Sequence, residues 1–357
     1  MSNIFDHFTI VCNIVKHISW EDIRNFKKMN SLCFEVCERE EIRRCSRILF
    51  GQLSLSKKTH KSNKRMKCIM DDSTLIKTNF QCKNPKLVLI MSSEKEIPIL
   101  NEIITSSCDK NTIICYAYSK HGNMGNSSLN EGMKFEKTFS PKSPGFSWLC
   151  LPTEIEADVL LHDSEIKANT KLVIVLNVST AKDSYCTKIF EDYPNIENPV
   201  YYAGGLVNSI GIFDHCKGAF EKTTPHISIA LSGDNLHIDT CVFPEDRDDS
   251  SSIRQAFLSL KERNDEFSKS NKIKYQCVLI FSCFLRKKIE LKLDNDSSPV
   301  TEYEMFARLF PSIPILGVLC EGEIFHANDG VVKLIKRLHY HDVEGVTSIF
   351  LLMSWTE

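Results

Sequence analysis

The chain of 357 residues lacks a long apolar run, a signal-peptide pattern and a large net charge. No hydrophobic stretch approaches the ~20 residues that a membrane-spanning helix needs. Asp6 stands where a signal peptide has its basic region, and Glu21 and Asp22 stand where it has small residues. Lys and Arg total 44 against 46 Asp and Glu, a formal net charge of -2, which does not favour nucleic-acid binding by the whole chain. We therefore expect neither a membrane nor a nucleic acid as a direct partner.

The chain also lacks a Cys-x-x-Cys pair, although it contains 15 cysteines. The cysteines are scattered, and several lie in apolar runs, namely Cys115, Cys150, Cys277 and Cys320. This usage predicts reduced intracellular thiols that pack as small hydrophobic side chains, without a disulfide framework. No metal site is expected either. His339 and His341 fall on one face of a predicted strand, but no third ligand is evident.

The first seventy residues divide into a helical part and a basic part. Apolar residues spaced three and four apart predict three short helices within residues 4–48, and Ser19 with Asp22 forms a capping box for the second. Residues 43–70 hold nine Lys or Arg and no acidic residue. We interpret residues 1–49 as a helical domain and 50–70 as a solvated linker. A nuclear-import or anion-binding role for the basic cluster stays open.

From residue 71 the pattern alternates between strands and helices, which predicts a mixed α/β fold in two parts, 71–195 and 196–357. A helix is expected at 251–267 and a central strand at 275–283. Residues 226–231 and 237–243 alternate in hydrophobicity around a Ser-Gly-Asp-Asn turn, which predicts a hairpin. Glycine and polar residues predict a double-glycine turn at Gly204 and Gly205, followed by a flexible loop at 208–218.

One stretch near the C-terminus combines a buried strand with carboxylates. Ser298 and Pro299 are expected to begin a helix that ends near Phe310. A buried strand at 315–320 follows, and then a tight acidic turn at 321–323. This turn is a candidate site, because a glycine there lets a ligand approach two carboxylates.

The N-terminal residues resemble an F-box. The match comprises residues 8–18 (FTIVCNIVKHI), residues 19–23 (SWEDI), and Phe26 through Met29 to Leu32. The usual Leu-Pro start is absent, and Cys33 or Phe34 replaces the usual tryptophan of the third helix.

Three later segments resemble the C-terminal domain of the FIST family, an α/β sensory module usually preceded by a FIST N-terminal domain. They are residues 203–205 (AGG), residues 278–283 (VLIFSC) followed by Arg286, and residues 310–317 (FPSIPILG) with 322–324 (GEI). Lys287 and Phe325 stand where this family usually has glycine. The order and spacing of these segments agree with proteins that join an F-box to FIST N- and C-terminal domains.

This resemblance implies a substrate receptor of an SCF-type cullin-RING ubiquitin ligase in the cytoplasm and nucleus, which marks proteins for proteasomal degradation. The partners would be the SCF adaptor, through it the cullin and RING subunits, and the substrates. The chain would supply no catalytic residue and no cofactor, since it acts by proximity. The candidate adaptor-binding residues are Phe8, Val11, Ile14, Ile18, Trp20, Ile23 and Phe26. The candidate substrate or ligand pocket consists of Ala203, Gly204, Gly205, Cys283, Arg286, Cys320, Gly322 and Glu323.

A second hypothesis belongs to a different class. The α/β part could be a sensor or enzyme for a small, amino-acid-like ligand, with the N-terminal helices serving only as a cap or dimer surface. Glu323 would then pair with a ligand ammonium at a pocket mouth, or it would merely cap a nearby turn. Cys283 and Cys320 are better explained as buried structural thiols than as nucleophiles. The apolar N-terminal face discriminates the hypotheses, because an exposed face needs a partner.

Overall fold

The computed structural model describes residues 8–15, 25–45, 49–54, 85–95, 100, 101, 104, 108, 110–125, 145–160, 166–178, 200–221, 225–243, 250–286, 291, 300–326, 332–336 and 347–357. Within these ranges, no helix combines the length and the apolar character needed to cross a membrane. The fold is a mixed α/β arrangement with few helices and three mixed sheets, which confirms the predicted class.

The helices whose bounds the structure describes are α1 (Phe8–Val15), α3 (Ser31–Cys45), α7 (Ser250–Ser270) and α8 (Glu302–Leu309). The strands of the first half are β1 (Leu49–Ser54), β2 (Leu87–Ser92), β3 (Ile113–Tyr118), β4 (Asn123–Gly125), β5 (Gly145–Leu151), β6 (Glu156–Leu160), β7 (Thr170–Val178) and β8 (Tyr201–Val207). The strands of the second half are β9 (Ser209–Asp214), β10 (Ala219–Glu221), β11 (His226–Ser232), β12 (Leu236–Phe243), β13 (Ile273–Cys283), β14 (Ile315–Cys320), β15 (Gly322–His326), β16 (Val332–Lys336) and β17 (Ser348–Thr356).

The three sheets share one pattern of strand directions. The first sheet has the order β1-β5-β2-β3-β9-β10, the second β16-β15-β8-β7-β11-β6, and the third β12-β17-β13-β14-β4. Each contains a single parallel pair among the described strands, namely β2 with β3, β7 with β8, and β13 with β14. All other described pairings are antiparallel, so each sheet joins one crossover unit to flanking antiparallel strands.

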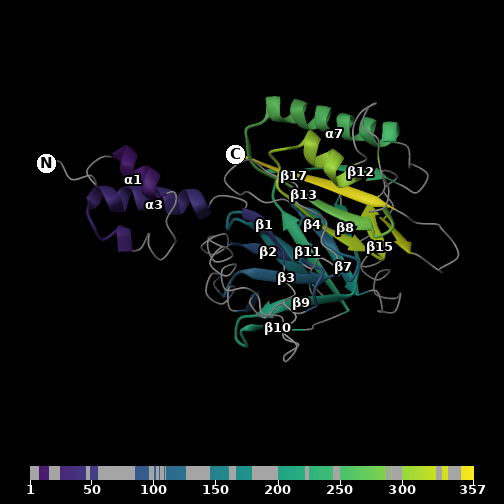
Figure 1. The fold of residues 1–357 in the computed structure, drawn as a ribbon, viewed down its shortest axis with the longest axis horizontal. Coiled ribbons are helices and arrows are strands. Elements are labelled where there is room, and N and C mark those ends of the chain that lie inside the picture. The colour runs from purple at the N-terminus through teal and green to yellow at the C-terminus, as the bar shows by residue number, and fades with distance from the viewer. Residues whose placement is uncertain are drawn as a thin grey trace.

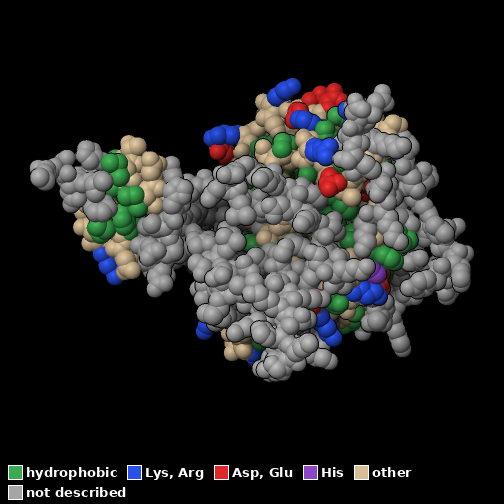
Figure 2. Space-filling model, viewed as in Figure 1, with side chains coloured by type: hydrophobic (Ala, Val, Ile, Leu, Met, Phe, Trp, Pro, Cys, Tyr) green, Lys and Arg blue, Asp and Glu red, His purple; other side chains and the backbone are tan. Residues whose placement is uncertain are grey.

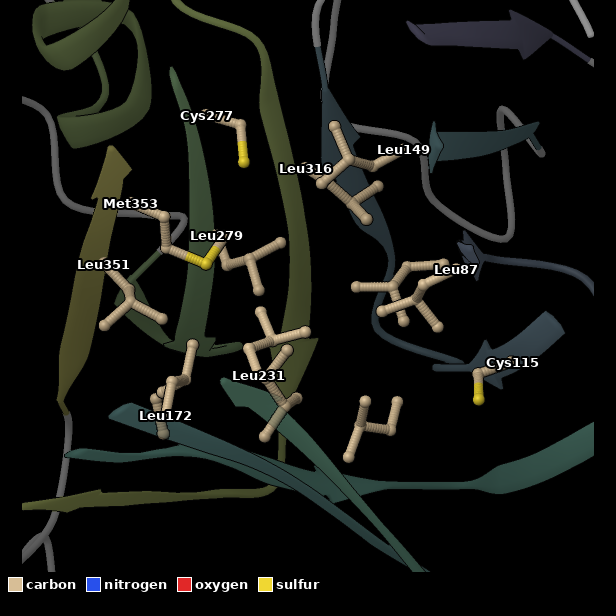
Figure 3. Close-up of a cluster of buried hydrophobic side chains, with 14 of the residues drawn as sticks. Leu87, Cys115, Leu149, Leu172, Leu231, Cys277, Leu279, Leu316, Leu351 and Met353 are labelled. Carbon is tan, nitrogen blue, oxygen red and sulfur yellow. The ribbon is translucent and has the colours of Figure 1, made fainter. Parts of the chain in front are cut away.

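The inner faces of the three sheets enclose a common apolar core. Leu87 and Leu149 of the first sheet, Leu172 and Leu231 of the second, and Leu351 of the third belong to one buried cluster. Figure 3 shows these side chains pointing toward one another from separate strands. Because full burial of each such side chain stabilises the fold by roughly 1.5–3 kcal/mol, this shared core holds the sheets together.

Helices cover the outer face of the third sheet. The strongly amphipathic α7 buries Ile253, Phe257 and Leu260 against it. The Phe257 ring packs edge-to-face on Phe243 of β12 and Phe350 of β17, at centroid distances of 4.9 and 4.8 Å. Figure 1 shows α7 lying across the top of this sheet. The helix predicted at 251–267 is confirmed and is slightly longer.

The predicted linker and domain boundary need correction. Residues 50–54, assigned to the linker, belong to β1, which pairs antiparallel with β5; residues 55–70 lie outside the described residues. The boundary expected at 195/196 does not separate two sheets, because β3 pairs with β9, β7 with β8, and β4 with β14. The two predicted α/β parts therefore form one interleaved body.

Two predictions for residues 208–243 are wrong. The expected loop at 208–218 contains β9, which buries Ile210 and Phe213. The expected hairpin does not form, since β11 joins the second sheet and β12 the third. An alternating pattern specifies which face of a strand is buried but leaves its partner open.

The helix and the strand that precede the candidate site are found close to where the sequence predicts them. Helix α8 begins after Thr301, whose hydroxyl and Glu304 form a capping box, whereas Ser298 lies outside the described residues. Strand β14 is confirmed at 315–320. The acidic turn is reduced to Glu321, because Gly322 and Glu323 already belong to β15.

Substitution of Gly204 tests how closely β7 and β8 must approach each other. A Cβ at this position would lie 1.7 Å from the Val175 carbonyl oxygen, and backbone cannot yield as a side chain can. We expect Gly204→Ala to lower the free energy of unfolding by about 3 kcal/mol or more, measured by urea denaturation. Gly211→Ala is the matched control, because its Cβ would stand 3.1 Å from the Glu221 carbonyl oxygen. Equal effects of the two substitutions would contradict this account.

Candidate functional site

The candidate site lies at the carboxyl ends of β13 and β14. These parallel strands are joined by α8, and their last residues, Cys283 and Cys320, are register partners. In open α/β sheets, ligands bind outside the carboxyl ends of parallel strands. After Glu321 the chain enters β15 of the second sheet, where Glu323 pairs with Gly205 of β8. The site is therefore a junction between two sheets.

The glycines of β8 serve close packing. Gly204 and Gly205 lie inside the strand, which corrects the expected turn. A Cβ on Gly205 would stand 2.3 Å from Cys320 Sγ and 3.1 Å from the Gly322 carbonyl oxygen. Neighbouring Ala203 is buried in the common core and pairs with Phe325. The structure thus brings the predicted residues of three strands together, but it fills the space between them with protein.

Arg286 lies within a buried ion pair. Its side chain is fully buried with that of Glu302, and its Nε donates to Glu302 Oε1 at 2.9 Å. The second oxygen of Glu302 accepts a 2.8 Å bond from Ser348 Oγ. Ser348 in turn lies 2.6 Å from Ser282, which accepts from Tyr303 at 2.8 Å. Because its partners satisfy one another, this network is structural, and removing one charge would cost about 3–5 kcal/mol.

Glu323 is the unsatisfied group of the site. It is fully buried, which corrects its expected place at a pocket mouth. Within the described part of the chain neither carboxylate oxygen accepts a hydrogen bond of ordinary geometry, although the Thr347 amide is close enough to lower the pKa. Thr347 Oγ1 is likewise buried and unpaired among the described residues. Burial raises the pKa of Glu323 well above its ordinary value, and the Thr347 amide and the Arg286 charge only partly offset this shift. Burial therefore favours the protonated form of Glu323 in the folded chain.

The two cysteines of the site lie in the interior of the fold. Both are buried, and burial raises the pKa of the Cys320 thiol well above 9.0, with a further contribution from Glu323. A nucleophilic cysteine needs the opposite shift. The described residues also contain no group of three or more His, Cys, Asp or Glu placed to hold a metal. His339, His341 and Lys287 lie outside the described residues.

A polar cluster at the exposed rim was not predicted. Oε1 of Glu321 lies 2.5 Å from Lys120 Nζ, 3.1 Å from His121 Nε2 and 3.2 Å from Asn208 Nδ2. The His121 ring stacks on Phe284 with centroids 3.9 Å apart and an interplanar angle of 14°. These residues come from distant turns, so spacing in the sequence does not reveal them. Asn208, Phe284 and Glu321 each follow a strand directly, and Lys120 and His121 follow β3 within three residues; that position was the available signal.

The N-terminal helices form a unit with its own small core. Val11, Val15, Cys33, Val36 and Cys37 make up a cluster that contains no residue of the α/β body. Figure 1 shows α1 beside α3, apart from the sheets. Helix α3 begins where the Asn30 side chain accepts from the Cys33 amide at 2.8 Å. The middle of the three predicted helices falls largely on residues 16–24, outside the described residues.

The predicted adaptor-binding residues differ in exposure. Phe8 is 46% exposed, whereas Val11 is fully buried in the unit's own core, which corrects its assignment to the binding surface. Ile14 and Phe26 are half-buried, and Ile18, Trp20 and Ile23 lie outside the described residues. Exposed Ile10, Met29 and Phe34 were not predicted. Figure 2 shows hydrophobic side chains gathered on this unit.

Comparisons with known proteins add no relative, because no family model and no curated protein matches the chain.

Glu323 gives a prediction for pH dependence. Because its pKa is raised in the folded chain, its contribution to stability is complete below about 4.5 and is lost as pH rises through the folded pKa. Glu323→Gln removes this titration while the neighbouring Arg286 and Cys320 stay in place. Relative to wild type, we expect the variant to gain on the order of 1–3 kcal/mol between about pH 5 and pH 8, measured by urea denaturation across that range.

Glu262→Gln, at an exposed position of α7, is the matched control and should leave the wild-type pH profile unchanged. A Glu323→Gln profile parallel to that of wild type would show that this carboxyl group does not titrate anomalously.

Proposed function

We propose that the chain is a substrate receptor of an SCF-type ubiquitin ligase. Residues 1–49 would act as an F-box that binds the adaptor, and residues 71–357 as a FIST module that binds the protein substrate. The observation that carries this proposal is an exposed apolar surface on the N-terminal unit. Phe8, Ile10, Met29 and Phe34 account for four of the five exposed large hydrophobic side chains among the described residues.

This surface favours a protein partner on physical grounds. The core of the unit consists of small Val and Cys side chains, which bury little apolar area, and so small a helical unit gains stability by docking. Arg39 lies over the Phe8 ring at 5.7 Å and Lys27 over the Phe34 ring at 5.3 Å. Aromatic residues and Arg are enriched at protein interfaces. The α/β body has a single comparable residue in its described part, Leu258 of α7.

The receptor would position the substrate and would take no part in the chemical step of ubiquitin transfer. It would hold the substrate near the conjugating enzyme that the cullin and RING subunits recruit, in the cytoplasm and nucleus, and mark it for the proteasome. Tethering two reactants in this way raises their effective concentration without a catalytic side chain. The high pKa of the Cys320 thiol is consistent with this passive role.

A small-molecule sensor is the second candidate, and buried Glu323 favours it. A buried acid whose two oxygens accept no hydrogen bond of ordinary geometry among the described residues lacks the full set of donors that buried polar groups almost always have. A small amine could supply a missing donor. In this case amine binding would depend on Glu323 and not on the N-terminal surface.

The exposed aromatic residues test the receptor proposal. We expect Phe8→Asp and Phe34→Asp each to weaken binding of the full chain to the purified SCF adaptor at least about 30-fold, because each places a charge in a desolvated contact. Both positions are exposed, so the melting temperature should stay close to that of wild type. Affinity would be measured by titration calorimetry.

Two substitutions serve as controls. Asn13→Asp introduces the same charge at an exposed position of α1, and Leu258→Asp removes the exposed apolar residue of α7. Both variants should bind the adaptor as wild type does. Absence of adaptor binding by the wild-type chain, or equal loss in all four variants, would overturn the proposal.

A further inference from the structure

The chain passes between the three sheets several times, and three of these crossings meet at one place. Residues 119–122 carry it from the first sheet to the third, Asn208 from the second to the first, and Glu321 from the third to the second. Backbone bonds join these crossings. The Glu321 amide donates to Leu206 O at 2.9 Å, and the Asn208 amide donates to Tyr118 O at 2.9 Å. The carboxyl ends of β3, β8 and β14, one strand from each parallel pair, therefore converge here.

The side chains at this junction form a set of donors around a carboxylate. Lys120, His121 and Asn208 all direct a nitrogen at the same oxygen of Glu321, at 2.5, 3.1 and 3.2 Å. The donors are held in position by the fold, since the Lys120 amide donates to Asn208 Oδ1 at 2.7 Å and the His121 ring stacks on Phe284. Such a converging set is how proteins recognise a carboxylate group.

We propose that Lys120, His121 and Asn208 form a carboxylate-binding site, and that the side chain of Glu321 occupies this site until a ligand carboxylate displaces it. These side chains are partly open to solvent, so a ligand carboxylate can replace that of Glu321. The Lys120 side chain is 53% exposed, and those of Glu321 and His121 are 25% and 18% exposed. A partly exposed ion pair contributes little to stability, so the fold loses little when Glu321 turns outward.

The ligand is a compact carboxylate, either free or on the side chain of an acidic peptide. If the proposed receptor role holds, the ligand is an acidic segment of the substrate; the site itself does not depend on that role. Glu321 competes as a tethered group with a high effective concentration. An external carboxylate should therefore bind wild type weakly and should bind more tightly, by about tenfold, when Glu321 is removed.

Chemical rescue of Glu321→Ala tests the site in the full chain. Sodium acetate should raise the melting temperature of the variant by about 2–4 °C more than sodium chloride of equal ionic strength. The same pair of salts applied to wild type corrects for general salt effects, because its site is already occupied. The double variant Lys120→Ala, Glu321→Ala should lose the rescue.

A second experiment, with a peptide, distinguishes a free carboxylate ligand from the side chain of an acidic peptide. Fluorescence anisotropy with a labelled tetraglutamate peptide should show about tenfold tighter binding to Glu321→Gln than to wild type, because the neutral amide is a weaker competitor. Tetraglutamine is the control. Rescue by acetate without peptide binding would assign the site to free carboxylates. Should Glu321→Ala not fold, Glu321→Gln alone carries the test.

Two results would overturn the proposal. One is an equal response of wild type, Glu321→Ala and the double variant to acetate, together with no gain in peptide affinity on Glu321→Gln. The other is weaker peptide binding to Glu321→Gln than to wild type. Adaptor binding by the same variants should remain at the wild-type level, so failure of this site is distinguishable from failure of the receptor proposal.

Discussion

The structure depends on three sheets burying their inner faces in one core. No sheet can bury its inner face alone, so Leu87, Leu172 and Leu351 are each stabilised by strands of the other two sheets. This arrangement requires the chain to pass repeatedly from sheet to sheet. Where the chain leaves one sheet, the backbone groups that leave its ladder must find partners in another. The bonds from Glu321 to Leu206 and from Asn208 to Tyr118 meet that requirement.

The same geometry explains why polar groups gather where these passages meet. Buried strands end there, and the polar side chains that follow them must satisfy one another. Gly205 allows β8 to approach Cys320, and Arg286 finds Glu302 as a buried partner. Glu323 is the exception, since its register in β15 turns it into the interior, where its carboxylate accepts no hydrogen bond of ordinary geometry among the described residues. Glu321 lies two residues earlier, before β15 begins, and its side chain is 25% exposed.

Local patterns in the sequence predict where helices and strands form, but they do not predict which strands pair. Strand β14, strand β13 and helix α7 follow from apolar runs and periodicity, and each is found near its expected bounds. The pairing of β11 and β12 with different sheets could not be predicted, because alternation constrains a face and long-range packing selects the neighbour. The motif residues of the site do converge, but the burial of Glu323 depends on strands more than a hundred residues away. The donors around Glu321 were missed for the same reason.

One of the two proposed binding surfaces is apolar and the other is charged, and this difference bears on how a receptor could work. The surface of Phe8 and Phe34 is apolar, so its affinity arises from removing aromatic area from water and changes little with salt. The junction of Lys120 and Glu321 is charged and partly exposed, so its contribution is modest and is screened by salt. A permanent subunit contact favours the first kind of surface, whereas a substrate that must be released after modification favours the second. The α1–α3 unit has a core separate from that of the sheets, which would allow each surface to be occupied without altering the other.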